Sequence, residues 1–230
     1  MEKTLETTLA STTGKLLRDN FGKGPGSIYV SIGKPFITMY LRDFLAPMEQ
    51  VLLEQGHPLR VQETRDALMK KLIPEIKGII AAETNEQVNQ VYYDWSLEKK
   101  TGIIFAEFTP SGSEDVNILE NYPEKDSVNE EIIRFTEKAQ KSPENLHSYK
   151  LNARTIVSKR EKIFVQIEQE LIRTGFEEQL RLAKRKLEKG LIDIPHLEDL
   201  LGLQIDDVFV DWDFSHDAGY VVLVLNTTIK

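Results

Sequence analysis

The stretch EQVLLEQG at residues 49–56 returns as EQELIRTG at residues 168–175, and this recurrence decides the fold. After a two-residue deletion, VYYDW at residues 91–95 corresponds in the same way to VFVDW at residues 208–212. Apolar residues of one half align with apolar residues of the other over this length, which indicates that one domain is present twice. The offset is 119 positions before the deletion and 117 after it, and the first offset also pairs Val30 with Tyr149, Ile37 with Ile156 and Leu72 with Leu191.

Each copy shows two helical and two hairpin patterns in alternation. In the first copy, apolar residues recur at helical spacing within 5–17 and 61–80, and they alternate within 28–41 and 91–108. We therefore expect an α+β fold, a tandem duplication of a helix–hairpin–helix–hairpin domain. Each copy would form a four-stranded antiparallel sheet with helices on one face.

Two local features refine this prediction. Gly33 and Asn152 occupy equivalent positions in the first hairpin of each copy, and both tolerate the positive φ that many two-residue turns need. We therefore expect the first turn at Gly33-Lys34. In the second copy, Pro195 is expected to split or end the long helix.

The expected domains are residues 1–110 and residues 128–230. Residues 111–127, between them, contain Gly, Ser, Pro and five acidic residues, which is typical of a linker. We expect the two copies to pack as an internal pseudo-dimer.

The composition is that of a globular protein without thiol chemistry. The chain has 230 residues, 29 basic and 37 acidic side chains, a net charge of −8 and no cysteine. These values exclude disulfides, thiolate metal sites and cysteine nucleophiles, and they argue against nucleic-acid binding. The beginning of the chain lacks the apolar core of a signal peptide, so we expect a cytoplasmic location.

Four residues of the first copy are candidates for binding a small ligand: Lys23, Arg42, Glu49 and Asp94. Lys23 lies in the stretch GKGP, where backbone N–H groups beside a lysine suit an anion. A simple end of a helix is the competing interpretation. Glu49 recurs as Glu168 and Asp94 recurs as Asp211, so each is either a ligand-binding carboxylate or a structural one. A favourable charge in the first turn of a helix is the competing interpretation of Glu49.

The longest basic run of the chain lies at residues 181–189. If Leu180, Ala183 and Leu187 face inward, the cations face solvent and are candidates for contact with a partner or an anionic surface: Arg181, Lys184, Arg185 and Lys186. A solvated helix surface is the competing interpretation. The four histidines lack metal-ligand spacing, so we expect no metal, no cofactor and no catalytic residues.

Three stretches of the first half resemble the MpsC-like family, bacterial proteins associated with a sodium-translocating, membrane-potential-generating system. They are FGKGP at 21–25, LRDFLAPME at 41–49 and YDWS at 93–96, followed by the KTG turn at 100–102. The second half departs from this pattern, because Gln166 replaces Pro47 and Arg160 replaces Leu41. It resembles the family only as a diverged repeat.

The resemblance implies a partnership with a membrane transport complex that handles ions or bicarbonate. We therefore expect a non-enzymatic accessory or regulatory protein that docks on such a complex, as a peripheral protein at the inner face of the membrane. The alternative is an enzyme or sensor that binds a small anion in a cleft between the repeats. A homodimer is a further partner left open by the sequence.

Overall fold

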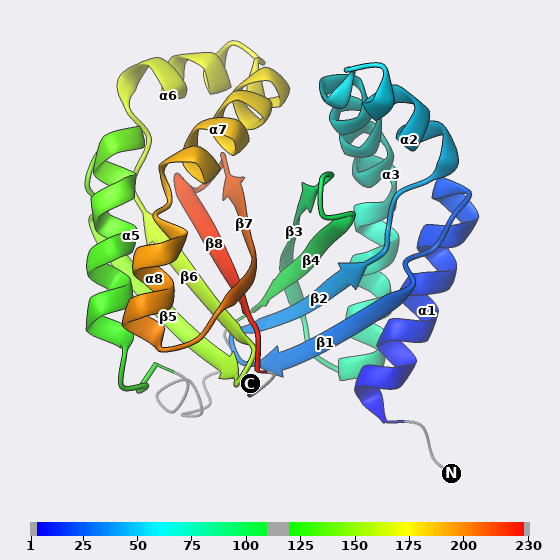
Figure 1. The fold of residues 1–230 in the computed structure, drawn as a ribbon, viewed down its shortest axis with the longest axis horizontal. Coiled ribbons are helices and arrows are strands. Elements are labelled where there is room, and N and C mark those ends of the chain that lie inside the picture. Colours follow the sequence, from blue (N-terminus) through cyan, green and yellow to red (C-terminus); the bar gives the residue numbers. More distant parts are fainter. Residues whose placement is uncertain (1–3, 110–119, 228–230) are drawn as a thin grey trace. The chain divides into compact units, whose positions relative to one another are not determined.

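The structure is a computed structural model that describes residues 4–109 and 120–227, and the chain divides into two units, Met1–Ser113 and Glu114–Lys230. The first unit contains, in chain order, α1 (Leu5–Phe21), β1 (Ser27–Gly33), β2 (Phe36–Arg42), α2 (Pro47–Glu54), α3 (Pro58–Thr84), β3 (Val88–Ser96) and β4 (Thr101–Phe108). The second contains α5 (Lys125–Ala139), β5 (Asn145–Asn152), β6 (Thr155–Glu161), α6 (Gln166–Arg173), α7 (Glu177–Leu191), α8 (Ile194–Leu201), β7 (Ile205–Asp213) and β8 (Ala218–Leu225) (Figure 1).

Each unit contains one four-stranded antiparallel sheet, and the two sheets have the same topology. The strand orders are β1-β2-β4-β3 and β5-β6-β8-β7. Even the register shift near the start of β3, between Val88 and Gln90, recurs in β7 between Ile205 and Asp207. The predicted α+β fold with two similar domains is therefore confirmed.

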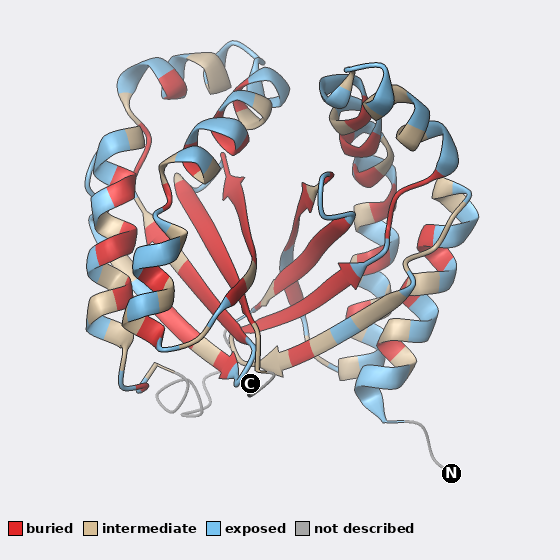
Figure 2. Cartoon of the chain, viewed as in Figure 1, coloured by how far each residue is buried: buried red, intermediate tan, exposed pale blue. Residues whose placement is uncertain are grey.

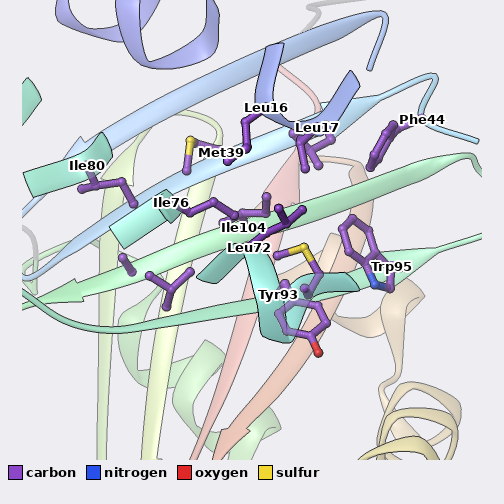
Figure 3. Packing of buried hydrophobic residues seen from close by; sticks show 14 of the residues in the cluster. Leu16, Leu17, Met39, Phe44, Leu72, Ile76, Ile80, Tyr93, Trp95 and Ile104 are labelled. Carbon is purple, nitrogen blue, oxygen red and sulfur yellow. The ribbon is translucent and has the colours of Figure 1, made fainter. Parts of the chain in front are cut away.

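The core of the first unit lies between the sheet and the helices α1 and α3. Strand residues that face the helices, such as Met39, Tyr93 and Ile104, pack against Leu17 of α1 and Ile76 of α3 (Figure 3). All five side chains are at most 4 % exposed. Burial of each large apolar side chain stabilises a fold by about 1.5–3 kcal/mol, so this layer accounts for the position of both helices.

The opposite face of the same sheet is also apolar. It carries Phe36, Tyr92, Ile103 and Phe105, and the rings of Tyr92 and Phe105 stack with centroids 5.1 Å apart. The central strands are consequently buried along most of their length (Figure 2). Because apolar residues occupy both faces, these strands show near-continuous hydrophobic runs rather than a strict polar alternation.

The prediction of the first turn was wrong in its position. Gly33 pairs with Phe36, so the two turn residues are Lys34 and Pro35, joined by a cis peptide bond. Gly33 and Asn152 both end strands and neither has a positive φ. Asn152 acts instead through its side chain, whose Oδ1 accepts a hydrogen bond of 2.8 Å from the backbone N–H of Arg154, as in an Asx turn.

The second unit differs from the first mainly where its long helix breaks. In the first unit, α3 runs for 27 residues, whereas the corresponding segment forms two helices, α7 and α8. Pro195 lies in the first turn of α8, where a missing N–H costs least, and Asp193 caps that helix through the N–H of His196. The predicted split is confirmed.

Helix α5 begins at Lys125, inside the stretch expected to be linker, and residues 110–119 lie outside the described residues.

The packing of Gly102 against Trp95 gives the first prediction. A Cβ atom at Gly102 would lie 2.6 Å from Cζ3 of Trp95, whereas a Cβ atom at Gly78 in α3 would meet no atom within 4 Å. We expect Gly102→Ala to lower the free energy of unfolding by about 1–3 kcal/mol through overpacking. Gly78→Ala should raise it by about 0.5–1 kcal/mol, because alanine favours the helix.

Urea denaturation followed by circular dichroism measures both changes. A Gly102→Ala protein as stable as the wild type would contradict the packing of Trp95 on the bare backbone of β4.

Candidate functional site

Glu49 lies in the first turn of α2, just after the loop that connects β2 to this helix. Its Oε2 accepts a hydrogen bond of 2.8 Å from the backbone N–H of Ala46, which precedes the helix. The same carboxylate receives two hydrogen bonds from Arg65 of α3, one from Nε to Oε1 at 2.7 Å and one from Nη2 to Oε2 at 2.6 Å. This bidentate geometry is the strongest form of an arginine–carboxylate pair.

Arg65 is fully buried, and its surroundings are aromatic. Its guanidinium carbon lies 4.9 Å from the ring centroid of Phe44 and 4.8 Å from that of Trp95, with Phe21 at 5.7 Å. Its Nη2 also donates to the backbone carbonyl of Phe44 at 2.8 Å. The pair therefore joins α2, α3 and the loop after β2, next to the end of α1 and strand β3. The carboxylate of Glu49 lies in the first turn of α2, where the competing interpretation places it, and its hydrogen bonds go to groups of the same unit.

The other three candidates of the first unit have separate surroundings. Lys23 forms an ion pair of 3.3 Å with Asp43 at an exposed position. Arg42 is exposed at the end of β2. Asp94 is fully buried, and its Oδ1 accepts a hydrogen bond of 2.7 Å from the backbone N–H of Trp95. No interaction described in the structure joins any two of the four candidates, Glu49 included.

The second unit repeats the Glu49–Arg65 pair with a lysine. Glu168 accepts a hydrogen bond of 2.9 Å from the backbone N–H of Val165 and another of 2.6 Å from Nζ of Lys184. The ammonium lies 5.1 Å from the ring centroid of Phe164 and 5.2 Å from that of Trp212. Lys184 follows Glu168 by the same 16 positions that separate Arg65 from Glu49.

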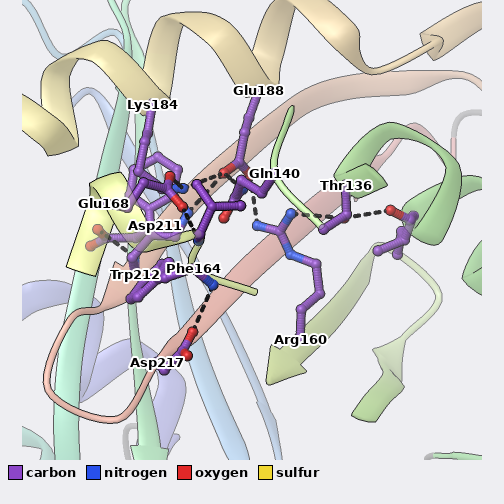
Figure 4. Close-up of polar contacts among 12 residues, drawn as sticks. Thr136, Gln140, Arg160, Phe164, Glu168, Lys184, Glu188, Asp211, Trp212 and Asp217 are labelled. Carbon is purple, nitrogen blue, oxygen red and sulfur yellow. Dashed lines mark hydrogen bonds and ion pairs between the residues drawn. The ribbon is translucent and has the colours of Figure 1, made fainter. Parts of the chain in front are cut away.

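A second buried ion pair is added in this unit. Nη2 of Arg160 lies 2.7 Å from Oε2 of Glu188, and both side chains are fully buried (Figure 4). Oε1 of Glu188 accepts hydrogen bonds from Nε1 of Trp212 at 3.0 Å and from Nε2 of Gln140 at 2.5 Å. Lys184 lies 3.3 Å from the same oxygen. Two cations thus face two carboxylates, and the cluster is balanced in charge.

The surroundings of Glu188 change its titration. Burial alone raises the pKa of its carboxyl, but the charges of Arg160 and Lys184 outweigh burial and hold the pKa below the ordinary value of 4.5. The carboxylate is therefore ionised in the folded protein at neutral pH, as an ion-paired network requires.

The buried ion pair of Arg65 and that between Arg160 and Glu188 were not predicted from the sequence. An alignment of the two halves nevertheless contains evidence for both pairs. At the offset of 119, a basic residue follows each recurrent glutamate by the same spacing, at 65 and at 184. The same offset places Arg160 on Leu41 and Glu188 on Met69, so two apolar residues of one unit are replaced together by an ion pair in the other.

The predicted orientation of α7 was wrong. Leu187 is 49 % exposed, whereas Lys184 and Arg185 are 3 % and 2 % exposed. The physical reason is the buried network, since Lys184 and Glu188 lie four residues apart on one helix face and both have their partners in the interior. Hydrophobic periodicity alone assigns charged residues to the outer face of a helix, whereas paired charges can also occupy the inner face.

The remaining two basic candidates of α7 differ from each other. Arg181 is partly exposed and forms an ion pair with Asp211, which also accepts a hydrogen bond of 2.8 Å from the backbone N–H of Trp212. Lys186 is exposed to solvent. The basic run is consequently divided between the interior and the surface, rather than spread over the surface.

Exposed apolar residues gather at one corner of the first unit, where α2 turns into α3. Met48 is 72 % exposed, Val51 45 % and Leu59 54 %. We call these three residues the α2–α3 corner. At the equivalent corner of the second unit, Ile167 is 65 % and Phe176 49 % exposed, but a glutamate, Glu170, stands in place of Val51.

Within residues 4–109 and 120–227, no group of three or more acidic or histidine side chains is placed to hold a metal ion. No helix in the same ranges is long and apolar enough to span a bilayer. A depression of about 200 Å³ between α5 and α8 is lined in part by Glu131, Arg134 and His196. Arg134 binds both oxygens of Glu131, at 2.6 and 2.8 Å.

The buried pair of the first unit gives the second prediction. Glu49→Gln leaves the charge of Arg65 buried without its counter-charge, so we expect the free energy of unfolding to fall by about 3 kcal/mol. Lys23→Ala breaks only an exposed pair and should change it by less than about 1 kcal/mol. Urea denaturation of the two variants compares them, and equal stabilities would contradict the structural role of Glu49.

The network of the second unit gives a prediction on pH. Because the folded-state pKa of Glu188 lies below its unfolded-state value of about 4.5, its stabilisation is fully present above that pH. It is lost as the pH falls through the folded-state pKa. In a Trp95→Phe variant, Trp212 is the remaining tryptophan and reports on this unit. The urea concentration at which the second unit is half unfolded, measured by the fluorescence of Trp212, should decrease as the pH is lowered from about 6 to about 3.

Glu188→Gln in the same background is the control, since other acidic groups of the unit titrate in this range. The decrease should be smaller in the control. A decrease of equal size would show that Glu188 contributes nothing to the pH dependence.

The first half of the chain matches a known protein family. The family described as the Na+-translocating membrane potential-generating system (MpsC) matches residues 1–109. No curated protein and no solved structure gives a significant match. The matched residues include the whole of the first unit's sheet, the Glu49–Arg65 pair and the α2–α3 corner. Residues 1–109, the first half of the chain, therefore belong to the MpsC family.

Proposed function

We propose that this protein is a non-enzymatic accessory protein that docks on a membrane complex coupled to sodium or bicarbonate. The match of residues 1–109 to a family named for a sodium-translocating, membrane-potential-generating system is the observation that carries the proposal. The docked protein would lie at the inner face of the membrane, as a peripheral component.

The interior of the first unit supports a binding role over a catalytic one. Glu49 and Arg65 are joined by two hydrogen bonds, and aromatic rings pack around the guanidinium. Lys23 has Asp43 as its partner at the surface. Glu49, Asp94 and Lys23 thus have partners within the first unit, Arg42 is exposed at the end of β2, and no interaction described in the structure joins any two of the four.

The α2–α3 corner is the surface that we assign to docking. Large apolar side chains are costly to leave in water, and a group of them commonly marks a site of protein contact. Met48 and Val51 lie on the same side of α2, three residues apart, with Leu59 just beyond the turn into α3. The occupant that fits is an apolar surface of the membrane complex, formed outside the bilayer by one of its subunits.

The test is affinity capture of the tagged full-length chain from gently solubilised native membranes, with and without sodium and bicarbonate. We expect an integral membrane transporter to be recovered in near-stoichiometric amount and identified by mass spectrometry. Met48→Asp with Val51→Asp should reduce its recovery at least about tenfold, the effect of about 1.4 kcal/mol of binding free energy. Dependence of the recovery on either ion would add a sensing role.

Ile167→Asp is the matched control, because Ile167 is the equivalent of Met48 in the second unit and is similarly exposed. Its recovery of the transporter should equal that of the wild type. Recovery of no membrane protein by the wild type would overturn the proposed function. Equal recovery by the wild type and the Met48/Val51 variant would overturn the assignment of the docking surface.

A further inference from the structure

Strand β1 is an edge strand with an unusual composition. Among the strands of the described residues, its one neighbour in the sheet is β2. Its sequence, SIYVSIG, contains neither a charged residue nor proline, and six of its seven residues are at least partly exposed. Edge strands are usually protected by charges, by proline or by bulges, because their unpaired backbone groups attract other strands. The equivalent strand β5 carries Lys150 and His147.

The hairpin geometry defines which backbone groups of β1 point away from the sheet. A two-residue loop joins Gly33 to Phe36, and the pair that closes such a loop exchanges both of its hydrogen bonds. Hydrogen-bonded and non-hydrogen-bonded pairs then alternate along the strand. Ile28, Val30 and Ile32 therefore direct their N–H and C=O groups away from β2, toward the open edge.

These three residues make the edge self-complementary. An antiparallel copy of the strand, centred on Val30, places Val30 opposite itself and Ile28 opposite Ile32. On the other face, Tyr29 comes to lie opposite Ser31. No like charges oppose each other in this register, and β-branched side chains form the cross-strand pairs, which favours pairing.

Helix α1, which covers β1, is also uncharged at this edge. Gly14 of α1 approaches β1 so closely that a Cβ atom on it would lie 3.3 Å from Cδ1 of Ile28. Residues 7–14 of the helix, TTLASTTG, carry no charge, whereas the equivalent residues 126–133 of α5 include Asp126, Glu130 and Glu131. A two-fold axis through the Val30 pair would place both copies of α1 on the same side of the joined sheet.

We propose that β1 is a dimerisation strand. A second copy of this chain pairs with it in antiparallel fashion about Val30, so that the four strands of each first unit form one continuous sheet. The second unit takes no part in this interface, because Lys150 and the acidic residues of α5 protect its corresponding edge. The proposal is independent of docking on a membrane complex.

The first test is the mass of the purified full-length protein by sedimentation equilibrium at increasing concentration. The wild type should approach the mass of a dimer. Val30→Pro removes the outward N–H at the centre of the interface without removing a bond to β2, and should be monomeric. Val30→Ala retains that N–H and should remain dimeric.

The second test does not depend on how well Val30→Pro folds. The chain has no cysteine, so a single introduced thiol can cross-link only with its copy. At the Val30 pair the Cα atoms would be about 5.5 Å apart, which suits a disulfide. Val30→Cys should therefore form a covalent dimer on mild oxidation. Ser27→Cys is the matched control, since its two copies would lie about 20 Å apart, six residues along the strands.

The outcomes separate the proposal from its alternatives. A wild type that stays monomeric at every concentration overturns it, and so does a dimer that persists in folded Val30→Pro. Equal cross-linking of the Val30→Cys and Ser27→Cys variants overturns the register. Cross-linking confined to Val30→Cys supports both the strand and its centre.

Discussion

Both units depend on one interaction, a buried ion pair between the first turn of a short helix and the long helix that follows. The carboxylate also accepts a hydrogen bond from the backbone N–H just before the short helix. It thereby fixes where that helix begins, and the cation fixes where the long helix lies. Aromatic rings surround the cation in each unit. Arg65 faces one carboxylate, that of Glu49, whereas Lys184 faces two, those of Glu168 and Glu188. Removal of either partner leaves the other without compensation in the interior.

The second unit shows what happens when a second polar pair enters such a core. Arg160 and Glu188 occupy positions that are leucine and methionine in the first unit, and neither could be buried alone. Trp212 and Gln140 supply the additional hydrogen bonds that a buried carboxylate needs. The inner face of α7 is accordingly polar, and part of its apolar surface is turned to solvent. The two units keep one backbone fold with interiors of different chemistry.

The architecture was predictable because the same pattern of apolar residues occurs in both halves of the sequence. Strand alternation recurs at fixed offsets and agrees with the observed strands, and Pro195 marks the break of the long helix that distinguishes the second unit. The interior was less predictable, since hydrophobic periodicity assigns charged residues to the surface. Lys184 violates that rule because the carboxylates of Glu168 and Glu188 meet it in the interior. The position of the first turn was predicted wrongly because residues of positive φ are not the only ones that form such turns. Lys34 and Pro35 form it in the first unit, and the side chain of Asn152 stabilises it in the second.

The unbroken α3 also has a mechanical consequence. Its 27 residues span about 40 Å, from the turn beside the α2–α3 corner to the start of β3. The ion pair with α2 clamps this helix near one end, and Pro74 in its interior removes one backbone hydrogen bond, so the helix bends most easily there. A force applied at that corner by a bound partner would be carried along α3 as far as Pro74. The corresponding segment of the second unit is jointed at Ile192 and Asp193, and it would absorb the same force at its joint.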